Sequence, residues 1–239
     1  MTEPPLAPRV CAAAVAELSR VGILRNPYFV ALQSGAMTFD RFLGSQQQFS
    51  FAVTHFPRPM AALLARLPHP RQRLDILRNL VEEHGHFREA AFHHSTFRDF
   101  LATLGCPSDS LDAVRAGPAV RAFNAVLSAA AALDEVEVGV ACLGVVEYAF
   151  AGLSARIGEA VVGRGWVPAD QLVHYRRHAE IDERHGEEFF AVVEPLWQDD
   201  RHRHGIEDGL ALGAYAFDRL YRDLLTDHRD EETGIGSPT

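Results

Sequence analysis

Apolar positions recur along almost the whole chain with the spacing of one helix face, whereas the alternation typical of strands is hard to find. Residues that cap or break helices stand between these patterns, such as Asn26 before Pro27, Thr38, and Gly105. The pattern predicts an all-α bundle of about seven helices with short turns between them. The predicted helical segments are residues 10–21, 27–35, 38–67 with a kink near Pro57 and Pro59, 70–104 loosened at Gly85, 108–116, 118–132, 134–162, 168–193 and 207–226.

No internal repeat and no linker rich in proline, glycine or serine divides the 239 residues. A single helical domain over residues 1–228 is therefore the simplest interpretation. The end of the chain, HRDEETGIGSPT, is polar and carries no helical pattern. We expect residues 229–239 to form a disordered tail.

Charge and cysteine usage exclude several classes of function. The net charge is −9 and no stretch is basic, which argues against a nucleic-acid partner. The three cysteines are scattered without a CxxC pair, so neither a disulfide framework nor a structural zinc site is expected. The N-terminus lacks a signal-peptide pattern, and no apolar stretch approaches the roughly 20 residues that cross a membrane. These features predict a soluble cytoplasmic protein with no membrane partner.

The segment HYRRHAEIDERHGEEFF places His178, Asp182 and His185 at positions i, i+4 and i+7 of a predicted helix. A helix turns about 100° per residue, so the three side chains share one face. Two imidazoles around a carboxylate are half of a site for a divalent metal such as iron or manganese. The alternative is a solvated polar helix, on which His174 continues the same spacing outward.

A second group of acids and histidines lies in NLVEEHGHFREAAFHH, where Glu83 precedes His93 by ten residues. On a straight helix these two side chains would point about 80° apart and lie about 15 Å apart along the axis. One ion could not bind both in that arrangement. If the helix loosens at Gly85, the chain could bring them together.

The same segment offers other pairs with i, i+4 spacing, namely Glu89 with His93 and Glu82 with His86. Either pair could bind one ion without distorting a helix. His94 adjoins His93 but points about 100° away, so the two cannot readily serve the same ion. The choice between Glu82, Glu83 and Glu89 stays open at this point.

One glutamate, Glu147, lies inside the strongly apolar run VEVGVACLGVVEYAFAGL. Burying an unpaired carboxylate is costly, so such a residue normally has a partner. A metal ion, Arg156 or a tyrosine hydroxyl could serve. We favour the metal because the chain supplies two other groups of ligand-type residues.

Four segments in chain order resemble the haem-oxygenase-like di-iron oxidases, a helical superfamily that also includes thiaminase-type and pyrroloquinoline-quinone-synthase-type proteins. They are THFPRPMAALLARLP, NLVEEHGHFREAAFHHSTFRDFLATLG, CLGVVEYAF and HAEIDERH. The resemblance implies a haem-oxygenase-like bundle that binds two iron ions, Fe(II) or Fe(III), with O2 as co-substrate. The ligands that it implies are Glu83, His93, Glu147, His178, Asp182 and His185.

The chain departs from relatives of this kind in two places. Ala90 stands where some branches carry a further glutamate three residues before the histidine. No cysteine is placed to act as the nucleophile of a thiaminase, so the resemblance to thiaminase-type proteins does not extend to their activity.

The resemblance implies an O2-dependent oxidase or oxygenase acting on a small molecule. A free amino acid in natural-product biosynthesis is the preferred substrate, with desaturation, cyclisation, C–C cleavage or N-oxygenation as outcomes. Arg156 and Arg177 are candidates for binding its carboxylate. The alternatives are a fatty-acid oxidative decarboxylase, a non-catalytic metal-binding protein and a metal-free bundle. An external electron donor and a homodimer are left open. The aromatic candidates for a pocket are Phe49, Phe51, Phe56, Tyr148 and Phe150.

Overall fold

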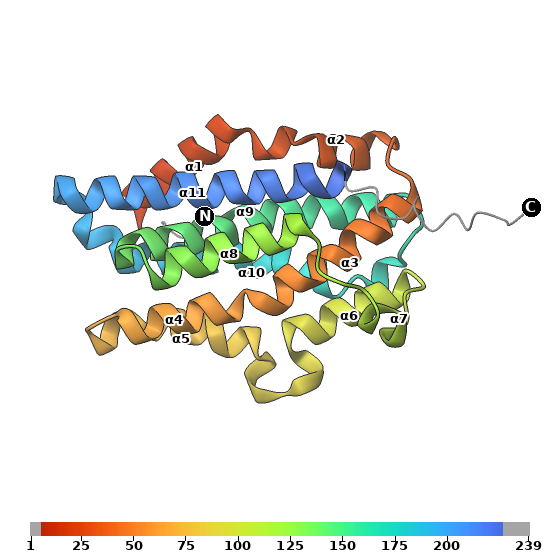
Figure 1. Cartoon of the computed structure of the whole chain (residues 1–239), viewed down its shortest axis with the longest axis horizontal. Helices are drawn as coiled ribbons and strands as arrows, with labels where there is room; N and C mark the ends of the chain where they lie inside the picture. The colour runs from red at the N-terminus through yellow and green to blue at the C-terminus, as the bar shows by residue number, and fades with distance from the viewer. Residues whose placement is uncertain (1–5, 227–239) are drawn as a thin grey trace, which may run out of the picture.

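The computed structural model describes residues 6–226, and within that range it contains eleven α-helices, five short 3₁₀ helices and no strand (Figure 1). The α-helices are α1 (Pro8–Val21), α2 (Pro27–Ser34), α3 (Phe39–His55), α4 (Pro57–Arg66), α5 (Pro70–Glu83), α6 (His93–Thr103), α7 (Ser108–Asp112), α8 (Pro118–Ala132), α9 (Val136–Gly163), α10 (His174–Val193) and α11 (Asp200–Thr226). The predicted all-α fold class is confirmed.

The predicted caps begin and end helices for the expected reasons. The side chain of Asn26 accepts a hydrogen bond from the backbone N–H of Tyr28, and Thr38 caps α3 in the same way. Gly105, with a φ of 80°, follows the end of α6 in the left-handed conformation that glycine adopts without strain. Local chemistry therefore fixes these boundaries.

Within residues 6–226 the structure has more α-helices than the predicted seven, partly because two long predicted segments, 38–67 and 70–104, are each divided. Pro57 lacks a backbone N–H, and the helix expected over residues 38–67 separates into α3 and α4 at Phe56. The helix expected over 168–193 begins only at His174, after a 3₁₀ turn, whereas α11 begins at Asp200, seven residues before its predicted start. The predicted tail, residues 229–239, lies outside the described residues.

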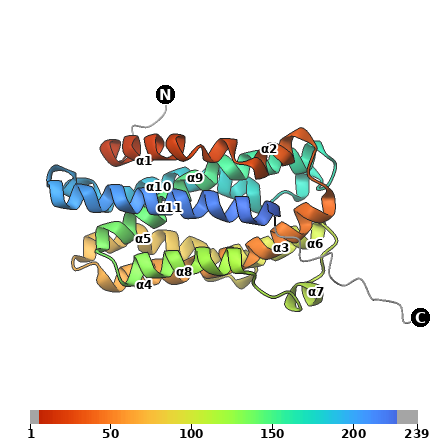
Figure 2. The ribbon, with the colours of Figure 1, turned by 45° about the horizontal axis from the view of Figure 1, so that its top comes forward.

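Helix α9 runs through the middle of the bundle, with α10 and α11 packed along it (Figures 1 and 2). It is long and apolar enough to cross a membrane by composition alone, so the sequence-based statement that no stretch approaches that length was wrong. However, 78% of its most apolar 18-residue window is buried by the other helices. It is therefore the core helix of this bundle, and its apolar run reflects burial on all sides.

Glycines let α10 and α11 lie directly against α9. A Cβ atom on Gly186 of α10 would come within 2.8 Å of the Tyr148 backbone. On α11, a Cβ on Gly209 or Gly213 would come within 2.4 Å of a carbonyl oxygen of α9. The three helices are thus fixed in register by backbone contact, which also fixes where the side chains of α9 and α10 meet.

We predict that Gly213→Ala lowers the free energy of unfolding by about 1–3 kcal/mol, because the new methyl group has no room beside Cys142 and Val145. Gly152→Ala is the matched control, since Gly152 lies on α9 with open space around it. It should stabilise the protein by about 0.5–1 kcal/mol. Urea unfolding of the three proteins tests this, and equal stabilities would contradict it.

Candidate metal centre

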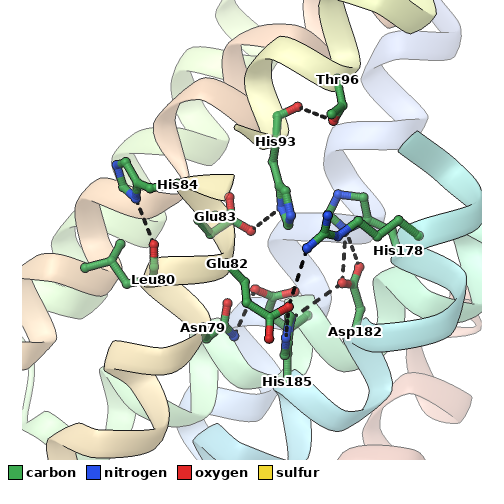
Figure 3. Close-up of polar contacts among 12 residues, drawn as sticks. Asn79, Leu80, Glu82, Glu83, His84, His93, Thr96, His178, Asp182 and His185 are labelled. Atoms are coloured by element: carbon green, nitrogen blue, oxygen red, sulfur yellow. Dashed lines mark hydrogen bonds and ion pairs between the residues drawn. The ribbon is translucent and has the colours of Figure 1, made fainter. Parts of the chain in front are cut away.

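Four helices carry the six predicted ligands, and Figure 3 labels all of them except Glu147. Glu83 is the last residue of α5, His93 is the first residue of α6, and Glu147 lies midway along α9. All six side chains are buried. The other three share one face of α10: His178, Asp182 and His185.

A left-handed turn between α5 and α6 lets Glu83 meet His93. Residues 85–87 all have positive φ, and a Cβ on Gly85 would lie 2.4 Å from the carbonyl carbon of Ala91. His93 Nδ1 donates a hydrogen bond to Glu83 Oε1 over 2.7 Å. The loosening at Gly85 considered from the sequence therefore occurs, and it closes the separation that a straight helix would impose.

Each of the three histidines has one ring nitrogen beside a carboxylate and one ring nitrogen without a hydrogen-bond partner. His178 Nδ1 lies within hydrogen-bond distance of both oxygens of Asp182, at 2.8 and 2.9 Å, and His185 Nε2 lies 3.4 Å from Glu82 Oε2. The remaining nitrogens, Nε2 of His93 and His178 and Nδ1 of His185, are buried without a hydrogen-bond partner. Carboxylates commonly orient histidines in this way so that the other nitrogen can bind a metal.

Two buried carboxylates lie close together on α9 and α10. Only one group of three His, Cys, Asp or Glu side chains within residues 6–226 has its three donor atoms within 4.8 Å of one another. It consists of Glu147, Asp182 and His185. Burial raises the pKa of Glu147 well above its usual value, and Asp182 raises it further. Burial, with Glu83, does the same to Asp182. A bound cation would offset both the desolvation and the repulsion.

Burial also keeps two of the imidazoles in the neutral form that binds metals. It lowers the pKa of His178 to about 3, with His93 adding to the effect. Burial lowers the pKa of His185 as well, although Glu82 opposes the shift. Glu83 and His93 behave differently. Burial opposes the ionisation of both side chains, but their mutual attraction prevails, so the pKa of Glu83 is lowered and the pKa of His93 is raised.

Residues 45–218 match the family described as iron-containing redox enzyme. The chain belongs to this family. Two 4-aminobenzoate synthases, from Chlamydia muridarum and Chlamydia trachomatis, are each 24% identical to this iron-containing redox enzyme. The alignments span 179 and 183 residues, and they cover 74% of this chain and 75% and 76% of the relatives.

Solved structures with the same fold cover almost the whole chain. A TenA homologue from Pseudomonas syringae pv. tomato has a TM-score of 0.69 at 16% identity, covering 94% of this chain and 97% of its own. A CADD-like protein of unknown function from Nostoc punctiforme has a TM-score of 0.71 at 14% identity, covering 91% and 97%. A domain with a heme oxygenase-like fold from Shewanella denitrificans has a TM-score of 0.68 at 15% identity, covering 91% and 89%. The haem-oxygenase-like architecture implied by the sequence motifs is confirmed.

The buried donors suit the iron of an iron-containing redox enzyme, because imidazole nitrogen and carboxylate oxygen are ligands that iron accepts. The alternatives left open by the sequence fit less well. Glu89 is exposed, as are His86 and His94, and Glu82 lies beside His185 at the edge of the cluster. The geometry therefore favours Glu83 over the other two glutamates as the partner of His93.

A small apolar cavity of about 50 Å³ adjoins the cluster. Its polar wall consists of Glu83, His93, Glu147 and His178. Among the aromatic residues considered from the sequence, Phe51 and Tyr148 do not line it. The apolar wall consists of Phe49, Ala52, Val53, Phe56, Phe123, Val146, Phe150 and Phe217.

Three polar side chains beside the cluster were not predicted as part of it from the sequence: Asn79, His174 and Thr96. Asn79, one helical turn before Glu83, has its Nδ2 donating to Glu147 Oε1 over 3.4 Å. His174, which was named from the sequence only for the alternative of a solvated polar helix, is buried, and its Nδ1 lies 3.1 Å from the Thr96 hydroxyl. The i, i+4 spacing of Asn79 with Glu83 and of His174 with His178 was the signal that could have found two of them.

We predict that metal binding releases protons and weakens as the pH falls, because the raised pKa values of Glu147 and Asp182 make protons compete with a cation for both carboxyls. Calorimetric titration with Fe(II) under argon, in buffers of different ionisation enthalpy, measures the number released. Glu147→Gln should release fewer protons. Metal binding without proton release would contradict the raised pKa values.

The same shifts predict the stability of the metal-free protein. The folded pKa values of both carboxyls lie above the value of about 4 in the unfolded chain. The two carboxyls therefore contribute their full stabilisation of the folded state below about pH 4. This stabilisation is lost as the pH rises through their raised pKa values. Consequently Glu147→Gln should flatten the decline in Tm with rising pH, measured without metal.

Proposed function

We propose that the chain is a non-haem di-iron oxidase or oxygenase that uses O2 to oxidise a small, largely apolar molecule. One observation carries the proposal: three buried imidazoles, each with one nitrogen beside a carboxylate, present nitrogens without hydrogen-bond partners beside two neighbouring buried carboxylates. The ligands proposed for the two irons are Glu83, His93, Glu147, His178, Asp182 and His185.

Iron bound here would supply the oxidising chemistry together with O2. The chain's own side chains orient the donors, since Asn79 holds Glu147 and acids hold the imidazoles. The apolar wall keeps water away from the cluster. Reduction of O2 to two waters takes four electrons, and removal of two hydrogen atoms from a substrate supplies two. The other two would come from an external donor, which is part of the proposal.

The pocket supports an apolar substrate better than a free amino acid. A carboxylate and an ammonium group would need charged partners, and no arginine lines this pocket. Arg156 instead donates to the backbone carbonyl of Leu24, and Arg177 lies 3.8 Å from Glu82 at the edge of the cluster. An aliphatic chain or an aromatic ring would bury its surface against the phenylalanines. We therefore favour the alternative considered from the sequence, a substrate of the fatty-acid kind, or an aromatic compound.

The names of the relatives and the expected cellular location also bear on the proposal. The chlamydial relatives are named for the synthesis of 4-aminobenzoate, which supports oxidative chemistry on a small molecule. A cytoplasmic location without a nucleic-acid or membrane partner completes the proposal. A non-catalytic metal-binding protein would use the same donors, so the experiment has to separate storage from turnover.

The test loads metal-free protein with two equivalents of Fe(II) under argon and adds O2 with candidate substrates. We predict that medium-chain fatty acids or apolar aromatic compounds accelerate O2 uptake at least tenfold, whereas free amino acids do not. Mass spectrometry should detect an oxidised product. Accumulation of ferric iron, with no substrate consumed, would identify a metal store instead of an enzyme.

Variants separate the metal cluster from the pocket. His178→Ala should lose iron and activity together, whereas His84→Ala, at an exposed histidine, should change neither. Ala52→Phe fills the apolar wall and should raise KM roughly tenfold with iron content unchanged. Loss of iron from the Ala52 variant, or full activity of the His178 variant, would refute the assigned roles.

A further inference from the structure

A fourth histidine, His174, lies inside the bundle at the start of α10. It precedes His178 by four residues and therefore shares its helix face. Its side chain is only 1% exposed. Neither the sequence motifs nor the resemblance gives it a role.

Hydrogen bonds fix which nitrogen of His174 carries its proton. The Thr96 hydroxyl donates to the backbone carbonyl of His93 over 3.0 Å. Since this uses its only hydrogen, it must accept from His174 Nδ1, 3.1 Å away. The neutral ring then has an unprotonated Nε2, and this atom is buried without a hydrogen-bond partner.

The surroundings of His174 offer this nitrogen no donor. The rings of Phe97 and Tyr175 pack against it with centroids 4.8 and 5.3 Å away, and the Tyr175 hydroxyl donates to Gln46 instead. An unsatisfied buried acceptor costs about 1–3 kcal/mol. A partner from outside the chain would remove that cost.

His174 thus repeats the arrangement of the three predicted histidine ligands, with one nitrogen held and the other unpartnered. Its ring centroid lies 4.3 Å from that of His178 and 6.4 Å from that of His93, and the latter two rings are 4.5 Å apart. Two imidazoles bound side by side to one ion at about 2.1 Å would have centroids about 4.5 Å apart. Two of the ring pairs, His174 with His178 and His178 with His93, are therefore spaced as neighbouring ligands of one ion can be.

We propose that His174 is a fourth histidine ligand of the metal centre. Its Nε2 would bind the same ion as His178. The inference rests on the proposed function, because it assumes that the cluster binds metal. Within residues 6–226 only Glu147, Asp182 and His185 bring three donor atoms within 4.8 Å of one another, so the proposal includes a turn of the imidazole rings when metal binds. One ion would then have mainly histidine nitrogen ligands, and the neighbouring ion would have mainly carboxylate ligands.

The test titrates metal-free protein with Co(II), whose visible absorption reports its ligands without any reaction with O2. His174→Phe removes the nitrogen and keeps an aromatic ring beside Phe97 and Tyr175. We expect it to weaken binding of one of two Co(II) ions at least tenfold and to change the spectrum of that ion. The control is His94→Phe, at an exposed histidine of α6, which should behave like the wild type.

A second variant distinguishes ligation from packing. His174→Ala leaves a space for a free imidazole, and added imidazole should restore the wild-type Co(II) spectrum. Wild-type affinity and an unchanged spectrum in His174→Phe would overturn the proposal and make His174 a packing residue. If the wild-type chain binds no Co(II) or Fe(II), the proposed function itself fails, so the two failures can be told apart.

Discussion

The buried carboxylates of Glu147 and Asp182 are the constraint on which the rest of the site depends. Their desolvation and mutual repulsion favour protons over charge, and only a cation or a proton can make their burial tolerable. The bundle keeps them there because glycine contacts fix α10 and α11 directly against α9. The packing of the core thus places two acids together, and the acids in turn define where a metal belongs.

The turn at residues 85–87, between α5 and α6, places two further predicted ligands in the site. Two of its members, His86 and Phe87, are not glycine and yet have positive φ, a conformation that costs about 1–3 kcal/mol per residue. Phe87 is 81% exposed, so packing does not compensate for the strain. What the turn provides is the contact between Glu83 and His93, which a continuous helix would prevent.

Helical spacing predicted the all-α fold and the face of α10 because both depend on local periodicity. The break at Gly85 was also predictable, since only glycine adopts that conformation cheaply. The burial of His174 was not, because it depends on how α6 packs on α10. Nor could spacing show that Glu82 would face His185, or that the pocket would lack an arginine, because those features arise between segments far apart in the sequence.

Mössbauer spectroscopy of the protein loaded with iron-57 tests whether two irons share this site. After exposure to O2, we expect two ferric ions per chain whose spins are coupled antiferromagnetically, with no electron paramagnetic resonance signal. A single iron per chain, or isolated high-spin ferric ions with a strong resonance signal, would contradict it.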